Sequence, residues 1–399
     1  METYDYIIAG GGCAGLSLAY YLHLEGLGDR RVLIIDRDDK QSNDRTWCFW
    51  SNQPTAFDSL IHKRWDRLAF ADKKGELVEH LGHRRYQMLR SIDFYRFMHQ
   101  ELDASPQIER RQAYISVIQE DEQGPYVVAG GHRIRARYVF DSCHYLSKLR
   151  EKQGNHHFLL QHFQGWTIRS KKPVFDPGKA LLMDFRTAQH GAARFFYVLP
   201  LSPERALVEY TLFSAQLLPK ENYERALRAY INGQLQIRDY QIEETEGGAI
   251  PMTDMPFPAR SAPHIINIGT QGGAVKPTTG YAFLNIQEQT RQIARQVLQG
   301  QSPAVRQANS RRFAFYDTLL LRILQQEGDW AAPIFSRLFR RNSMYNILTF
   351  LEEKSNLWQE AGIFASLPLR PFLKALAEVH VLGKSPVRTV RPKAAKSLS

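Results

Sequence analysis

The sequence contains few cysteines, no long hydrophobic run and no metal motif. Its three cysteines, Cys13, Cys48 and Cys143, are too few and too widely spaced for a disulfide framework, which indicates a reducing compartment. No stretch approaches the roughly 20 apolar residues that span a bilayer. Because the chain opens on a charged, strand-like segment instead of a secretory signal, we expect a cytoplasmic protein. The 13 histidines show no metal-ligand spacing, so no metal is predicted.

Positive charge exceeds negative charge, with a net charge of +11. Basic clusters lie at residues 169–172 and 337–341 and in the tail at Lys384, Arg388, Arg391, Lys393 and Lys396. Binding to nucleic acid, attraction to an anionic membrane surface and a solvated basic face each explain this charge. Aromatic residues make up 12% of the chain, which fits either a well-packed core or an apolar cavity for a large ligand.

The N-terminal pattern predicts a β-α-β unit. Residues Tyr4–Ala9 read as a buried strand, Ala14–Glu25 as a helix and Arg31–Asp36 as a second strand. Since such units are joined by right-handed crossovers, the fold class is α/β with a parallel sheet.

Three glycines and an acid sit where a dinucleotide would bind. Gly10 permits a tight turn, Gly12 lets a pyrophosphate approach the backbone, and Gly15 lets the helix pack on the strand. The free N–H groups of the helix N-terminus face the phosphates. Asp36 ends the second strand, where a carboxylate can accept both ribose hydroxyls of an adenosine.

Later segments return to the same domain. A hairpin over Tyr126–Ile134 leads to a strand, Arg137–Asp141, which ends in a carboxylate. Another apolar strand, Ile265–Gly269, is followed by Thr270–Gly273 and by a helix over Tyr281–Leu298. This second strand–glycine–helix junction offers further backbone donors to a cofactor.

The middle and the end of the chain lack the β-α-β pattern of the N-terminal part. Strands at Phe195–Leu199 and Ala206–Phe213 form an antiparallel hairpin, Asn222–Asn232 reads as a helix, and the chain from Ser302 to Ala377 is helical. We therefore expect a discontinuous nucleotide-binding domain at 1–155 and 247–300, an inserted antiparallel-sheet substrate domain at 156–246, a helical C-terminal cap at 301–380 and a basic disordered tail at 381–399.

Several residues are candidates for chemistry. Leu207, Glu209 and Thr211 share one strand face; in an apolar cavity Glu209 would be a desolvated proton donor, and otherwise a solvent-facing side chain. Gly280, in the run Pro277–Tyr281, would let the backbone approach a flat ring system, or would merely begin a helix. The segment Asp44–Trp50 could line a substrate channel or contact a cofactor.

Arg90 precedes a helix over Ile92–Glu101. Its guanidinium could neutralise a pyrophosphate, although an ordinary surface role explains it equally well.

Together these residues resemble the flavin-dependent lycopene cyclase family of bacterial type, over nearly the whole chain. Leu207–Thr211 is similar to the family's acidic segment, and Glu246–Met252 is similar to its Glu-x-x-x-Ile-Pro-Met stretch. The Gly269–Gly273 and Pro277–Tyr281 runs look like its flavin-side loop. Related monooxygenases and reductases usually carry Gly-Asp where this chain has Gly269-Thr270. A second similar stretch at 350–354 is interpreted as a helix surface bearing Glu352 and Glu353.

The resemblance implies a Rossmann-like FAD-binding domain and a lycopene β-cyclase that closes β-ionone rings by acid–base chemistry. FAD would be reduced, with NAD(P)H as reductant and no net redox change. Glu209 would donate a proton, and Glu209 or Glu246 would accept the ring proton. The implied cofactor-binding residues are Gly10, Gly12, Gly15, Asp36, Arg90, Asp141, Gly269, Gly273, Pro277 and Gly280.

Lycopene and related linear carotenoids would be the substrates, giving β-carotene through γ-carotene. The implied location is the cytoplasmic surface of the cell membrane, with no nucleic acid as partner. The alternatives are a prenyl or carotenoid oxidoreductase of the same flavoprotein superfamily and a non-catalytic carotenoid or flavin carrier.

Overall fold

In the computed structural model, which describes residues 2–143, 146–303 and 310–381, the N-terminus forms the predicted β-α-β unit. Strand β1 (Thr3–Ala9), helix α1 (Cys13–Leu24) and strand β2 (Val32–Asp36) follow one another. Strands β1 and β2 pair in parallel, and β1 also pairs in parallel with β11 (His132–Asp141). The α/β prediction for this part of the chain is confirmed.

The first sheet has eight strands, in the order β17-β18-β11-β1-β2-β8, with β10 and β9 attached through β11. The remaining strands are β8 (Ile108–Gln112), β9 (Ile115–Asp121), β10 (Gly124–Ala129), β17 (Arg260–Ala262) and β18 (Ile265–Asn267). The predicted hairpin turn is present, because Gly130 and Gly131 both have positive φ values, of 56° and 83°.

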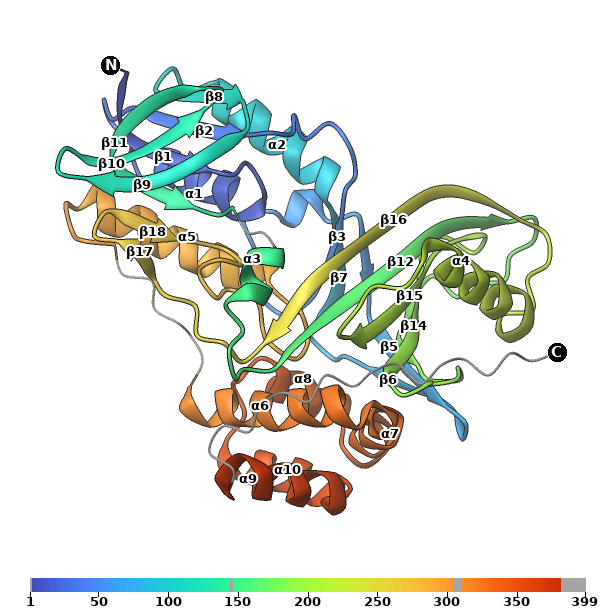
Figure 1. Ribbon diagram of the computed structural model, residues 1–399. Helices are drawn as coiled ribbons and strands as arrows, with labels where there is room; N and C mark the ends of the chain where they lie inside the picture. Colours follow the sequence, from blue (N-terminus) through green and yellow to red (C-terminus); the bar gives the residue numbers. More distant parts are fainter. Residues whose placement is uncertain (1, 144–145, 304–309, 382–399) are drawn as a thin grey trace.

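Helices cover one face of this sheet, as Figure 1 shows. They are α1, α2 (Ser91–Asp103) and α5 (Phe283–Leu298). The side chain of Ile8 packs among them, whereas Ile7 points to the opposite face and packs with Val127 and Val139. A parallel sheet with a glycine-rich β1–α1 turn is the Rossmann-like arrangement. A short helix, α3 (Leu146–Glu151), follows β11.

The second sheet has seven strands in the order β16-β12-β15-β14-β13-β5-β6. They are β5 (Arg67–Asp72), β6 (Gly75–His80), β12 (Phe158–Ser170), β13 (Lys179–Asp184), β14 (Ala193–Pro200), β15 (Arg205–Ser214) and β16 (Tyr240–Thr253). The predicted hairpin of β14 and β15 is present. A third sheet, β3 (Thr46–Ser51), β7 (Arg85–Arg90) and β4 (Lys63–Trp65), adjoins the second.

Sheet membership differs from the expected domain boundaries at two places. Residues 67–80, expected within the nucleotide-binding part, form β5 and β6 of the second sheet. Strand β5 pairs in parallel with β13, so this sheet is not wholly antiparallel. Strand β16 also runs through the expected boundary at 246. The reason is that pairing between strands over 100 residues apart leaves no local pattern in the sequence.

Helices cover both faces of the second sheet. The C-terminal cap consists of α6 (Arg311–Gln326), α7 (Ala331–Arg341), α8 (Met344–Leu351), α9 (Leu357–Ser366) and α10 (Leu369–Val381). It packs on one face, where the rings of Phe70 and Phe339 stack at 4.5 Å. Helix α4 (Lys220–Ala229) packs on the other face against Val208 and Leu212. Short helical turns lie at Asp58–Leu60, Tyr230–Gln234 and Gly328–Trp330.

The helical C-terminal region is as predicted, apart from residues 304–309, which lie outside the described ranges. The same holds for most of the predicted basic tail, from residue 382 onward. None of the helices in the described ranges is long and apolar enough to span a membrane.

Candidate functional site

One cavity of about 390 Å³ runs from the glycine loop of the first sheet to the face of the second. At one end it is lined by Gly10, Gly12 and Asp36, and at the other by Glu209 and Glu246. The structure therefore brings the nucleotide motif and both candidate acids to a single cavity.

The glycine loop has the geometry that a bound pyrophosphate needs. Gly10 has a φ of +101°, which favours glycine. A Cβ atom on Gly15 would lie 1.9 Å from the carbonyl oxygen of Gly10, so only glycine lets α1 begin this close to β1. At Gly12, by contrast, a Cβ would meet no described atom within 4 Å and would occupy open cavity space.

Helix α1 begins at this loop without a side-chain cap among the described residues and without an acid in its first turn. Its first N–H groups and the positive end of its dipole therefore remain available to an anion. Together with the space above Gly12, this N-terminus fits the pyrophosphate of a dinucleotide.

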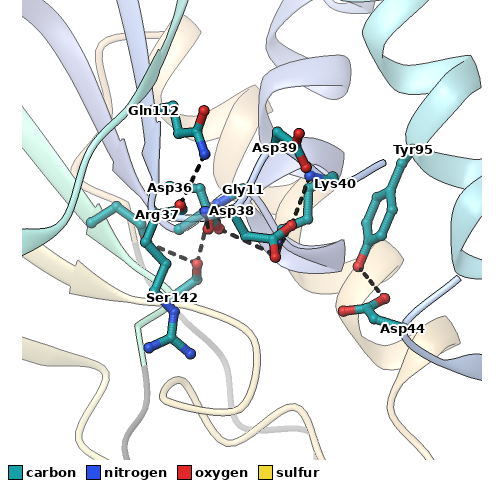
Figure 2. A network of polar contacts seen from close by, with 12 residues as sticks. Gly11, Asp36, Arg37, Asp38, Asp39, Lys40, Asp44, Tyr95, Gln112 and Ser142 are labelled. Atoms are coloured by element: carbon teal, nitrogen blue, oxygen red, sulfur yellow. Dashed lines mark hydrogen bonds and ion pairs between the residues drawn. The ribbon is translucent and has the colours of Figure 1, made fainter. Parts of the chain in front are cut away.

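The carboxylate of Asp36 lies beside the same loop, as Figure 2 shows. Its Oδ2 accepts a hydrogen bond from the N–H of Gly11 at 2.6 Å, and its Oδ1 accepts one from the N–H of Asp38 at 2.8 Å. Lys40 Nζ lies 3.6 Å from Asp36 Oδ2. These contacts fix the carboxylate at the cavity wall, where its remaining lone pairs can accept ribose hydroxyls.

The cations on this part of the cavity differ from the one proposed from sequence. Arg37, Lys40 and Arg45 line it. Among the described residues Arg90 is not part of this lining; its Nε donates to Asp93 Oδ2 at 2.8 Å. Sequence order suggested Arg90 because it precedes a helix, but a carboxylate three residues later holds its side chain.

The second glycine-rich junction packs against the first, because a Cβ atom on Gly269 would lie 2.7 Å from Cβ of Ala14 at the start of α1. Gly269, with a φ of +61°, and Gly280, with a φ of +70°, both line the cavity. The φ of Gly280 favours glycine, and a Cβ atom there would also lie 2.6 Å from Gln161 Oε1, so a larger residue would displace that side chain. The other three candidates, Asp141, Gly273 and Pro277, are not part of the cavity lining drawn from the described residues.

The two acids lie on one cross-strand row of the second sheet. Gly165 lies on β12, between β16 and β15, and pairs with Glu246 on β16 and with Glu209 on β15. Tyr197 on β14 also pairs with Glu209. A Cβ at Gly165 would lie 3.2 Å from Cγ of Glu246 and 3.4 Å from Cβ of Glu209. Glycine at this position therefore leaves room for the two carboxyl groups to meet above the sheet.

Burial and mutual repulsion change the acidity of this pair. Desolvation and the nearby charge of Glu246 raise the pKa of Glu209 to about 8, although Thr211 donates to its Oε1 at 2.8 Å. Desolvation also raises the pKa of Glu246, but hydrogen bonds from Thr46 and Glu209 oppose this rise. The Thr46 hydroxyl donates to Glu246 Oε2 at 2.6 Å. Both carboxyl groups therefore have a raised pKa, and repulsion between their charges favours a pair that keeps a proton near neutral pH.

The wall around the acids is apolar and aromatic. It consists of Cys48, Tyr86, Phe163, Tyr197, Leu199, Leu207, Ile250 and Tyr281. Such a lining suits a hydrocarbon, which offers no hydrogen-bonding group. The described residues contain no group of three or more His, Cys, Asp or Glu side chains that could hold a metal ion.

Sequence reasoning missed Gly165 and the role of Thr46, because both act through partners far away in the chain. It also misplaced Glu353. Instead of lying on a helix surface, this carboxylate accepts from Lys276 Nζ at 2.7 Å, and Lys276 also pairs with buried Asp317 at 3.2 Å. Glu352 is likewise partly buried, 3.5 Å from Arg84 Nη2. The two ion pairs of Lys276 connect the cap to the loop that carries Gly280.

Comparison with known proteins gives consistent results. The family model described as lycopene cyclase protein matches residues 5–377. The chain is 25% identical to the lycopene beta-cyclase of Pseudescherichia vulneris over 292 residues, which cover 70% of each chain. It is also 25% identical over 291 residues to the chloroplastic lycopene beta cyclase of Solanum lycopersicum, covering 69% of this chain and 57% of that one.

The fold is shared with a solved flavoenzyme. The structure of the flavin-dependent brominase Bmp2 matches with a TM-score of 0.58 and 15% identity, covering 95% of this chain and all of that one (100%). At this identity the likeness shows the fold alone, which agrees with the predicted Rossmann-like architecture. Since the family model spans nearly the whole chain, the protein belongs to the lycopene cyclase family.

Proposed function

We propose that this protein is a lycopene β-cyclase, which converts the linear end groups of lycopene into β-ionone rings, giving β-carotene by way of γ-carotene. The observation that carries the proposal is the acid pair of Glu209 and Glu246 in an apolar cavity that continues to a dinucleotide-binding loop. Lycopene is a hydrocarbon, so a buried carboxylic acid is the group needed to activate it.

In the proposed reaction Glu209 donates its proton to the terminal double bond of one lycopene end. The resulting tertiary carbocation is attacked by the neighbouring double bond, which closes a six-membered ring. Glu246 then removes a ring proton, and a new double bond forms. One proton enters and one leaves, so nothing is oxidised or reduced. Because Glu246 and Glu209 lie on either side of Gly165, the proton that Glu246 takes up can pass back to Glu209.

FAD in its reduced form is the proposed cofactor, with NAD(P)H as the reductant. Gly12, the α1 N-terminus and Asp36 would hold its pyrophosphate and ribose, and Gly269 and Gly280 would line the same cavity. When bound, a reduced flavin supplies negative charge that stabilises a carbocation electrostatically. We further propose that the protein works in the cytoplasm, at the surface of the membrane that dissolves its substrate.

The proposal predicts the isotope content of the product. Purified protein supplied with lycopene, FAD and NAD(P)H in deuterated water should give β-carotene with one deuterium per ring, because the donated proton exchanges with solvent and stays on the ring. The measurement is the mass spectrum of the pigment. A product with two added hydrogens would identify a reductase, and added oxygen a hydroxylase. Unchanged lycopene with bound flavin would indicate a carrier.

The roles of the two acids predict that two similar substitutions move different limbs of the pH–rate profile. Thr46→Val removes a donor to Glu246, so its pKa rises and the acidic limb of the pH–rate profile moves up by about one to two pH units. Thr211→Val removes a donor to Glu209, so the alkaline limb moves up instead. The measurement is the rate of lycopene cyclisation against pH. If both variants move the same limb, the two roles are assigned wrongly.

A further inference from the structure

The outermost helices of the cap expose apolar side chains. In α9 the exposed residues are Leu357, Trp358, Ala361, Gly362 and Ala365. Trp358 keeps 88% of its surface accessible, the largest exposed fraction among the exposed large hydrophobic residues described. No charged side chain is exposed on this helix, all of which is described. Water disfavours such a surface, so it marks an interaction site.

In α9 the charged side chain faces the protein interior and several apolar side chains face solvent, and contacts with neighbouring residues hold the helix in this orientation. Its single acid, Glu360, is 1% exposed. The carboxylate accepts hydrogen bonds from Arg312 Nε at 3.1 Å, Tyr316 OH at 3.0 Å and Ser355 Oγ at 3.1 Å. Because these partners fix the polar side of the helix inward, Trp358 is fixed outward.

Helix α10 extends the same kind of surface. Leu369, Leu373 and Leu376 are exposed, and their spacing of four and three residues places them on one helix face. Exposed Arg370 and Lys374 lie next to them in the sequence. Figure 1 shows α9 and α10 at the outer edge of the cap, with α6 between them and the sheets.

The sequence that follows α10 carries positive charge. Helix α10 leads directly into residues 382–399, whose sequence holds five basic residues, Lys384, Arg388, Arg391, Lys393 and Lys396, and no acidic one. Exposed tryptophan and leucine beside lysine and arginine are the composition of surfaces that bind the interface of anionic membranes.

We infer that the α9–α10 face, defined by Leu357, Trp358, Leu369, Leu373 and Leu376, docks onto an anionic lipid bilayer. The choice of a bilayer over a protein partner rests on this charge and on the proposed function, since a linear polyene dissolves in membranes.

The docking face is connected to the cavity. Shortly before α9 begins, Glu353 binds Lys276 at 2.7 Å. The loop that starts at Lys276 carries Thr279, Gly280 and Tyr281, which line the cavity wall. The Lys276–Glu353 ion pair therefore joins the segment before α9 to the loop that lines the cavity.

The test is co-sedimentation of the full-length protein with phosphatidylcholine vesicles, with and without phosphatidylglycerol. The wild type should bind the anionic vesicles more tightly, and its tryptophan fluorescence should shift to the blue as Trp358 enters the interface. The double variant Trp358→Ser/Leu373→Ser should bind at least tenfold more weakly, because two large apolar side chains no longer insert. The matched control is Leu217→Ser, which removes a leucine that is 56% exposed on another part of the surface.

Three results would overturn the inference. They are a wild type that does not bind anionic vesicles, a double variant that binds as well as the wild type, and a concentration-dependent dimer that the double variant cannot form. Activity on lycopene dispersed in detergent separates this inference from the proposed function. The double variant should cyclise detergent-dispersed lycopene like the wild type and lose activity only with vesicles. Vesicle binding without any cyclisation would support the docking inference and refute the proposed cyclase function.

Discussion

Glu209→Gln should reduce the rate of lycopene cyclisation by about 10²–10⁴-fold, the usual contribution of a general acid. Glutamine keeps the shape of the side chain and can still accept from Thr211, but it has no acidic proton for the double bond. The measurement is β-carotene formed per unit time by purified enzyme with saturating flavin. The matched control is Glu221→Gln, an exposed carboxylate on α4, which should retain wild-type activity.

The same substitution should raise thermal stability. The folded pKa of Glu209, about 8, lies above the ordinary value of 4.5, so the folded state binds more protons than the unfolded state between these values. Stability of the wild type therefore falls as pH rises from 4.5 to 8. Glutamine does not titrate, so the Tm difference between variant and wild type should grow over this window. An inactive variant that is also less stable at pH 8 would contradict this account.

Gly12→Val and Gly15→Ala should both lose flavin, for different reasons. A valine side chain at Gly12 enters open cavity space, so it excludes the pyrophosphate while costing the fold only about 1 kcal/mol at this helix N-cap. An alanine Cβ at Gly15 meets the carbonyl oxygen of Gly10 at 1.9 Å, so β1 and α1 must separate, at about 1–3 kcal/mol or more.

Flavin absorbance of the purified variants and the Tm of the flavin-free proteins separate these two effects. Gly12→Val should purify colourless with a nearly unchanged Tm, whereas Gly15→Ala should be colourless and clearly less stable. The matched control is Gly233→Ser, since that glycine has no positive φ, no described atom lies within 4 Å of its Cβ position, and it should leave flavin binding and Tm unchanged. If Gly12→Val retained flavin, the glycine loop at residues 10–15 would not be the pyrophosphate site.

Local patterns were sufficient for the parts of the fold that depend on neighbouring residues. The apolar run before Gly10, the helix after Gly12 and the acid at Asp36 determine the β1–α1–β2 unit, because each acts within a few residues of the next. The turn at Gly130 and Gly131 likewise fixes the hairpin of β10 and β11. Period-two alternation placed Glu209 and Thr211 on one face, where their hydrogen bond is found.

The tertiary structure alone decided which distant groups meet. Strand pairing brings Glu246 and Glu209 to either side of Gly165, and Thr46 reaches Glu246 across 200 positions of the chain. Arg90 is held by Asp93 away from the cavity lining.

Packing between helices likewise decided which side chains of the C-terminal cap are buried and which are exposed. Glu353, expected on the surface, is partly buried in an ion pair with Lys276, and buried Glu360 faces inward while Trp358 is exposed. The physical reason is common to all these cases: the free energy of a charged or aromatic side chain depends on which groups surround it, and those groups come from other elements. The sequence by itself determined the nucleotide-binding unit and the candidate acids, and packing between elements decided how the acids share a proton and which face of the cap is exposed.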